Sequence, residues 1–164
     1  LADDCTWEGA SSVAENGVEF IANVPTEEVF CAPHRDRVNG IVYGTKPYVY
    51  NGQLIEGWHV TFQDGQVIEH GAEKNAELLG KLLTTDENAN RIGEIAACHI
   101  AFGAGYPPNI KGGARLTRAQ LMEKGLNDSA IHEDVMIGAP DTRITGVCKD
   151  GTEVVIFENG EWAF

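Results

Sequence analysis

Asn-Gly and Asp-Gly pairs recur along the whole chain, and they constrain its fold more than any other feature. The pairs are Asn16-Gly17, Asn39-Gly40, Asn51-Gly52, Asp64-Gly65, Asp150-Gly151 and Asn159-Gly160. A two-residue type I′ turn needs positive φ at both positions, which Asn, Asp and Gly tolerate, so such pairs between apolar runs predict β-hairpins. The segments WHVTF-QDGQ-VIEH, YVY-NGQ-LI and VVIF-ENGE-WAF have this form. Most of the chain is therefore expected to be antiparallel sheet.

Side-chain alternation supports the same conclusion in the clearest hairpin. Trp58, Val60 and Phe62 are spaced by two, so they share one face of a strand and are expected to be buried together. Nowhere does the chain alternate strand and long helix as a parallel sheet requires.

Helical patterns are fewer. Residues 72–83 carry leucines on one stripe, as an amphipathic helix does. Two further helix starts have capping-box spacing, Thr84 with Glu87 and Thr117 with Gln120. The first predicts a short helix toward Arg91, and the second a helix that Gly125 ends. We expect an α+β domain, mainly antiparallel sheet with hairpins and a few short helices.

Length and charge narrow the class of protein. The 164 residues suit one domain with a hydrophobic core, and an apolar content of 43% argues against disorder. A formal net charge of -13 disfavours nucleic acid as a partner, because phosphate binding needs clustered Lys and Arg. It favours metal ions or substrates with an ammonium group, although an acidic surface alone accounts for much of the charge.

The cysteines and the ends of the chain indicate the compartment. Four widely spaced cysteines form neither a disulfide framework nor a zinc-ribbon pattern, so free thiols in a cytoplasmic protein are expected: Cys5, Cys31, Cys98 and Cys148. The sequence shows no membrane span and no signal peptide. Because it opens without Met, at LADDCTWEGA, we expect a fragment or a processed piece.

Potential metal ligands lie in several apolar stretches. In IHEDVMIGAP, His132 and Asp134 are two residues apart, so on a strand they share a face and could bind a metal or hydrogen-bond each other. Other candidates are Glu27 and Glu28 in VPTEEVF, Glu94 in RIGEIA, and His99 and Tyr106 in ACHIAFGAGYP. By themselves these residues indicate a site for a hard or borderline divalent metal, with satisfied core residues or a solvated turn as alternatives.

Together, four stretches resemble a known family: NVPTEEVFCAPHRDRVNGIVYGTKP, RIGEIA, CHIAFGAGYP and NDSAIHEDVMIGAPD. From about Val18 to the end, the chain resembles the C-terminal, metal-binding half of the metal-dependent aminopeptidases typified by aminopeptidases S and T. The resemblance implies that residues 1–164 are a metallopeptidase catalytic domain of a two-metal exopeptidase. Such an enzyme removes the N-terminal residue of peptides with a metal-bound hydroxide as nucleophile. The resemblance also implies a homodimer and two divalent ions, which are cobalt, zinc, magnesium or manganese.

Carried over residue by residue, the resemblance assigns the site. It implies metal ligation by Glu28, Glu94, His99, His132 and Asp134, and a catalytic role for Tyr106 and Glu28. Two cations could polarise the scissile carbonyl. Glu28 or Glu94 could take a proton from the water, and Tyr106 could donate a hydrogen bond to the oxyanion.

The sequence departs from the family in two places. The N-terminal domain of the family is absent, and GEIA runs straight into ACH, where the family has a further segment with another ligand glutamate. We therefore expect a missing loop between Ala96 and Ala97. On one continuous strand, Glu94 and His99 would point to opposite faces, since they are five residues apart.

Two rival functions follow from these departures and from the residue types. The first is an inactive fragment or remnant of the same fold with an interaction or structural role, which metal binding would distinguish. The second is another two-metal hydrolase such as a phosphoesterase, which the scarcity of basic residues near the ligands disfavours.

Overall fold

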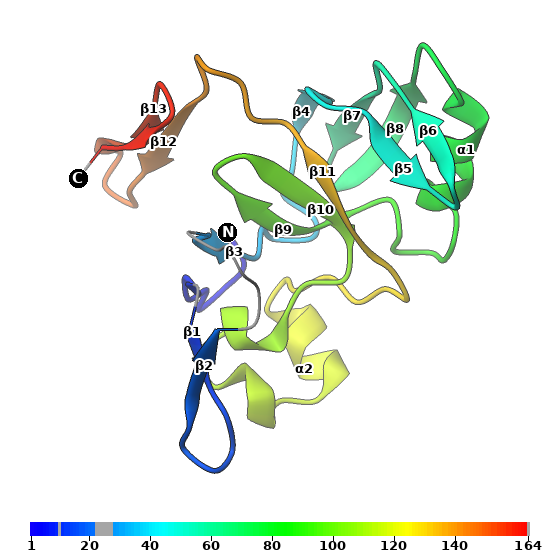
Figure 1. The fold of residues 1–164 in the computed structure, drawn as a ribbon. Helices are drawn as coiled ribbons and strands as arrows, with labels where there is room; N and C mark the ends of the chain where they lie inside the picture. The colour runs from blue at the N-terminus through cyan, green and yellow to red at the C-terminus, as the bar shows by residue number, and fades with distance from the viewer. Residues whose placement is uncertain (10, 22–27, 164) are drawn as a thin grey trace.

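Antiparallel strands dominate the computed structural model, which describes residues 1–9, 11–21 and 28–163 (Figure 1). A central four-stranded sheet has the order β11 (His132–Met136), β10 (His99–Gly103), β9 (Ile92–Ala96), β3 (Phe30–Cys31). A second sheet has the order β4 (Gly40–Tyr43), β7 (His59–Gln63), β8 (Gln66–Gly71), beside the hairpin of β5 (Tyr48–Tyr50) and β6 (Gln53–Ile55). The remaining strands are β1 (Ser11–Val13) with β2 (Glu19–Ile21), and β12 (Arg143–Val147), β13 (Glu153–Glu158) and β14 (Glu161–Trp162).

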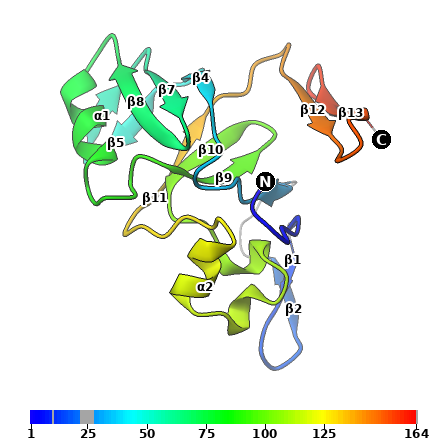
Figure 2. The same cartoon turned by 180° about the vertical axis from the view of Figure 1, so that it is seen from behind.

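Two α-helices lie on opposite sides of the central sheet. Helix α1 (Ala76–Leu83) packs beside the second sheet, and α2 (Arg118–Glu123) lies at the other end of the molecule (Figures 1 and 2). Short 3-10 turns at Pro107–Asn109 and Gly113–Arg115 precede α2. The described residues thus form a strand-rich α+β arrangement, as the sequence predicts. No helix in this part of the chain is long and apolar enough to cross a bilayer.

The three predicted hairpins are present with the expected turn chemistry. Both turn residues have positive φ in three pairs: Asn51-Gly52 (49° and 73°), Asp64-Gly65 (49° and 80°) and Asn159-Gly160 (54° and 87°). These pairs connect β5 to β6, β7 to β8 and β13 to β14. Asn39-Gly40 instead leads into β4, so the same dipeptide is not a hairpin turn everywhere.

The main core joins one face of the central sheet to the second sheet. Trp58, Val60 and Phe62 are all buried, as their alternation predicts. The ring of Phe102 in β10 lies 6.0 Å from that of Trp58 and 6.4 Å from that of Phe62. The leucines of α1 cover the same core, with Leu82 fully buried. This packing holds one face of the central sheet fixed and leaves the opposite face available for polar groups.

Two helix predictions need correction. The helix expected from residue 72 begins only at Ala76, because Lys74 bridges to Glu56 and Asn75 adopts a left-handed conformation with φ 60°. The short helix expected from Thr84 to Arg91 is a series of turns. The Thr84 hydroxyl donates back to the Gly80 carbonyl at 2.8 Å, so it closes α1 instead of starting a new helix.

The other two helix signals are confirmed. Thr117 and Gln120 form a reciprocal capping box at the start of α2. The helix ends at Glu123, and Gly125 follows with φ 89°. Strand β2 ends at Ile21, and residues 22–27, which follow it, lie outside the described residues.

Candidate metal centre

The register of the central sheet gathers the predicted ligands on one face. Ala101 lies opposite Glu94 on β9 and opposite Asp134 on β11, while Gly103 lies opposite His132. Because cross-strand partners and residues spaced by two share a face, Glu94, His99, His132 and Asp134 all project to the same side. Glu28, two residues before Phe30 of β3, reaches the same place. Glu27 lies outside the described residues.

Glu94 and His99 meet because the chain reverses between them. One continuous strand would place them on opposite faces, but the two residues lie on different strands. Residues 97 and 98 turn the chain, so Glu94 is on β9 and His99 is on β10. Glu94 Oε1 lies 2.9 Å from His99 Nε2.

Glu94 lies between the two histidines. Its Oε1 contacts His99, and its Oε2 lies 3.8 Å from His132 Nε2. Two groups of potential metal ligands therefore share it: Glu28, Glu94 and His99, and Glu94, His132 and Asp134. Within each group the ligand atoms all lie within 4.8 Å of one another. A shared carboxylate is the arrangement that can bridge two cations.

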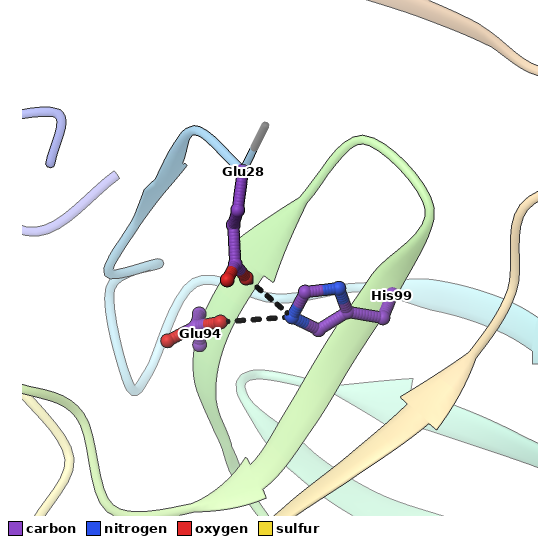
Figure 3. Close-up of side chains that lie close together, drawn as sticks. All are labelled: Glu28, Glu94 and His99. Atoms are coloured by element: carbon purple, nitrogen blue, oxygen red, sulfur yellow. Dashed lines mark hydrogen bonds and ion pairs between the residues drawn. The ribbon is translucent and has the colours of Figure 1, made fainter. Parts of the chain in front are cut away.

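The first group is the more enclosed by side-chain exposure, and Figure 3 shows its two carboxylates directed at His99. Glu28 Oε1 and Glu94 Oε1 approach the same His99 nitrogen, at 3.0 Å and 2.9 Å. Glu94 is 3% exposed and His99 8% exposed. Buried charges need a partner, because desolvation of an isolated ion is costly.

In the second group, His132 is fixed by a backbone carbonyl. Its Nδ1 lies 2.7 Å from the Ala104 oxygen, and because a carbonyl only accepts, Nδ1 carries a proton. Its Nε2 lies 3.4 Å from Asp134 Oδ1. A histidine held in this way presents Nε2 as the nitrogen available to a metal.

Tyr106 lies beside this second group. Its ring centroid is 4.5 Å from that of His132 and 6.0 Å from that of Phe30. The Tyr106 side chain is partly exposed, so it is accessible from solvent. Burial and then the negative charges of Glu94, Asp134 and Glu28 raise the pKa of Tyr106, which keeps it protonated as a hydrogen-bond donor.

Contacts within the cluster shift the pKa values of its histidine and carboxylate groups in both directions. The hydrogen bond to Glu94 raises the pKa of His99 to about 9, against the opposing effect of burial and with help from Cys98 and nearby acids. Burial raises the pKa of Glu28, and repulsion from Glu94 and Asp134 adds to the rise. The hydrogen bond from His132 lowers the pKa of Asp134. Protonated histidines thus offset the charge of crowded carboxylates in the metal-free chain.

Small residues make room for the cluster. Ala101, fully buried, lies between Glu94 and Asp134 on the face that bears the ligands. Gly93 is the extra residue of a β-bulge opposite β10, and a Cβ there would lie 2.1 Å from the Ala104 oxygen. The bulge therefore requires glycine, and it sets the direction of the neighbouring Glu94.

The donor set fits divalent cations. Three carboxylates and two imidazoles converge, and none of the four cysteines belongs to either ligand group. Oxygen and nitrogen donors of this kind suit hard and borderline ions such as magnesium, manganese, cobalt and zinc. Two such ions would also neutralise the crowded negative charge.

The structure brings together the six residues that the resemblance assigns to the site, and it adds two that sequence reasoning missed. Ala101 had one signal, its alternation with His99 and Gly103 in a strand. Ala104 contributes only its carbonyl, and its side chain carries no signal of that role.

Comparison with known proteins gives consistent matches. The sequence profile of the thermophilic metalloprotease (M29) family matches residues 1–97 and 96–162. Aminopeptidase 2 of Geobacillus stearothermophilus is 44% identical over 188 aligned positions, which cover 100% of this chain and 46% of the relative. Aminopeptidase AmpS of Bacillus subtilis (strain 168) is 41% identical, with 96% and 44% covered.

A solved structure agrees with the fold. Wild-type AmpT from Thermus thermophilus superposes with a TM-score of 0.92 at 35% identity, covering 100% of this chain and 46% of that one. The chain thus spans about half the length of the relatives it matches. The profile match also divides at residues 96 and 97, the place where the sequence departs from the motif spacing.

Proposed function

Because the chain belongs to the thermophilic metalloprotease (M29) family, we propose that it forms the metal-binding part of a two-metal aminopeptidase. Its reaction is hydrolysis of the peptide bond after the N-terminal residue of a peptide. The observation that carries the proposal is the position of Glu94, whose two oxygens face His99 and His132 in two adjoining ligand groups. Relatives named aminopeptidases give the reaction class.

Five side chains would hold the ions. Glu28, Glu94 and His99 form one site, and Glu94, His132 and Asp134 form the other. When bound, the two cations supply Lewis-acid activation of the scissile carbonyl and of the attacking water. The candidates remain cobalt, zinc, magnesium and manganese, since the donors suit all four.

Glu28 and Tyr106 are placed for proton transfer and oxyanion binding. Glu28 is more exposed than Glu94, and burial raises its pKa, so it suits the role of a base that takes a proton from water. The protonated Tyr106 hydroxyl would donate a hydrogen bond to the developing oxyanion. The surrounding carboxylates would attract the ammonium group of a free N-terminus.

The remaining parts of the proposal concern the assembly and the compartment. Free thiols at all four cysteines agree with a reducing compartment, and we propose the cytoplasm. We also propose a homodimer, as the family resemblance implies. Size-exclusion chromatography with light scattering would contradict the dimer if the purified chain has the mass of one copy.

Metal content and peptide hydrolysis test the main proposal. The purified chain, stripped with chelator and then dialysed against cobalt or zinc, should retain about two ions by elemental mass spectrometry. The loaded chain should release the N-terminal residue of a free peptide but leave the N-acetylated peptide intact, because the acetyl group removes the ammonium.

The outcomes separate the proposal from its alternative. Two ions with hydrolysis of the free peptide alone support it. Two ions without hydrolysis would favour a remnant of the same fold, for which the divided profile match and the half-length coverage provide a reason. No retained ion would contradict both the metal site and the activity of this chain.

A further inference from the structure

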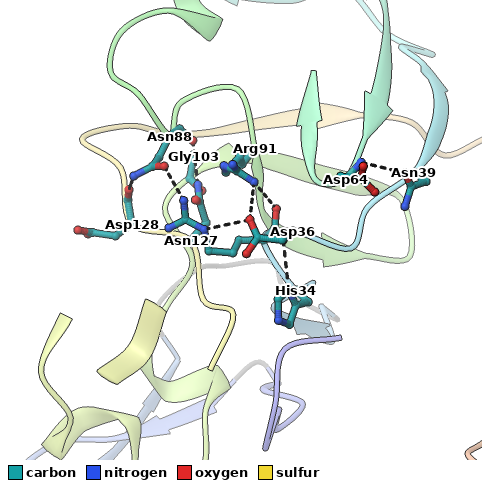
Figure 4. A network of polar contacts seen from close by, with 10 residues as sticks. His34, Asp36, Asn39, Asp64, Asn88, Arg91, Gly103, Asn127 and Asp128 are labelled. Atoms are coloured by element: carbon teal, nitrogen blue, oxygen red, sulfur yellow. Dashed lines mark hydrogen bonds and ion pairs between the residues drawn. The ribbon is translucent and has the colours of Figure 1, made fainter. Parts of the chain in front are cut away.

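A buried asparagine behind the metal centre connects two distant parts of the chain. Asn127 is 2% exposed, and its Nδ2 donates to the Gly103 carbonyl at 2.7 Å and to the Asn88 carbonyl at 2.9 Å (Figure 4). The backbone carbonyl of Asn127 in turn accepts from the Gly105 amide at 2.8 Å. Asn127 therefore holds the chain on both sides of Ala104.

Ala104 connects this restrained segment to His132 of the candidate metal centre. Its carbonyl accepts from His132 Nδ1 at 2.7 Å, and its amide donates to the Ile131 carbonyl at 2.7 Å. The Ala104 carbonyl thus favours a proton on Nδ1, while Asp134 Oδ1, 3.4 Å from Nε2, is the competing acceptor on the other side of the ring. Tyr106 follows directly after Gly105, so the same restraint also bears on the tyrosine.

The chemistry of this position requires an amide side chain. Only an amide offers two N–H donors at one nitrogen without bringing a charge into the core. An aspartate of the same shape could not donate, and it would face the Gly103 and Asn88 carbonyls with a negative charge. The loss would be felt first at Gly103, next to Ala104, whose carbonyl would lose the Asn127 donor.

We propose that Asn127 is a positioning residue that fixes the Nδ1–H tautomer of His132 through the Ala104 carbonyl and so prepares Nε2 to bind metal. Only the binding of metal to His132 Nε2 rests on the proposed function. The tautomer itself is a property of the metal-free chain and can be measured without any ion.

Asn109 provides a matched control. It is also fully buried, and its Nδ2 also points to two backbone carbonyls, those of Thr6 and Phe30, at 3.4 Å and 3.5 Å. Its side-chain contacts, to the Thr6 and Phe30 carbonyls, include neither Ala104 nor His132. Asn109→Asp therefore introduces the same chemical change in a similar setting without touching the proposed path.

Long-range 1H–15N NMR on the metal-free chain would report the His132 tautomer at a pH where the ring is neutral, with His132→Gln to assign the signals. The wild-type chain should show Nδ1–H. Asn127→Asp should show a mixture of tautomers, and Asn109→Asp should match wild type. In zinc titrations, Asn127→Asp should bind about 10–100-fold more weakly, as loss of a ligand's supporting contact does.

Several results would overturn the inference. An Nε2–H tautomer in the wild-type chain would do so whether or not a variant folds. So would a wild-type tautomer in Asn127→Asp, or equal loss of zinc affinity in both variants, which would indicate general destabilisation. If the wild-type chain binds no zinc, the proposed function fails, while the tautomer measurement still decides the role of Asn127.

Discussion

At the scale of single residues, Glu94 is the side chain that the two proposed ion sites have in common. Glu94→Gln removes the carboxylate that belongs to both ligand groups, so we expect the chain to lose both tightly bound ions. Glu28→Gln and Asp134→Asn each affect one group and should retain about one ion. Elemental mass spectrometry after dialysis measures the count.

A neighbouring acid controls for the loss of charge alone. Glu133 projects to the opposite face of β11, where it accepts a hydrogen bond from the Tyr48 hydroxyl. Glu133→Gln should therefore keep both ions. Retention of an ion by Glu94→Gln would show that the carboxylate is not shared.

Ala101 tests whether space on the sheet face limits metal binding. Ala101→Val adds two methyl groups between Glu94 and Asp134, so zinc affinity should fall at least tenfold, or about 1.4 kcal/mol. Ile100→Val alters the adjacent residue on the core face and should leave affinity unchanged. Competition with a chromophoric chelator gives both values, and equal affinities for Ala101→Val and wild type would refute the crowding argument.

Residue types and spacing predicted part of this site. The two-residue periodicity of a strand places His132 beside Asp134, and the structure shows them 3.4 Å apart. The relation of Glu94 to His99 could not be obtained in the same way. It depends on a reversal at residues 97 and 98, and neither residue has the chemistry of a typical turn.

At the scale of elements, the type I′ turns offer a matched comparison. Gly52 and Gly65 occupy equivalent turn positions with φ 73° and 80°. A Cβ on Gly52 meets nothing within 4 Å, whereas one on Gly65 would lie 1.7 Å from the Arg35 carbonyl oxygen. Gly52→Ala should cost about 1 kcal/mol from backbone strain alone, and Gly65→Ala should cost roughly 2 kcal/mol more.

Urea denaturation of the two glycine variants gives the free energies of unfolding directly. Similar losses in both would mean that the turn near Arg35 relaxes and that only the positive φ matters. A larger loss in Gly65→Ala would show that the β7–β8 hairpin packs its turn against the segment that follows β3.

Hairpins were more predictable than helix boundaries for a physical reason. An Asn-Gly pair forms a turn through its own backbone preference, so local sequence is sufficient at Asn51 and Asn159. Thr84 and Glu87 have the spacing of a capping box, but the preceding helix offers carbonyls closer to the threonine hydroxyl. Whether the Thr84 hydroxyl bonds backward to α1 or forward to a new helix depends on where α1 ends. Packing of α1 against the core sets that position.

At the scale of the whole molecule, the charge balance connects metal binding to stability. The chain has 25 acidic and 12 basic residues, and Glu94, the buried acid among the described residues, lies 2.9 Å from His99. In the metal-free fold, the hydrogen bond to Glu94 raises the pKa of His99 to about 9. The unfolded value is near 6.5. Proton binding to His99 therefore stabilises the metal-free fold below about pH 6.5, and this contribution is lost as the pH rises to about 9.

The same proton competes with metal, so the two forms should respond to pH in opposite ways. From pH 6.5 to 9, the melting temperature of the chelator-treated chain should fall by roughly 5 °C more in wild type than in His99→Gln. Over that interval zinc should bind more tightly as the pH rises, because His99 loses the proton that competes with the metal. Differential scanning fluorimetry on both chains, with and without stoichiometric zinc, measures the effect. An identical pH dependence in wild type and His99→Gln would mean that His99 is not the group that couples proton, metal and fold.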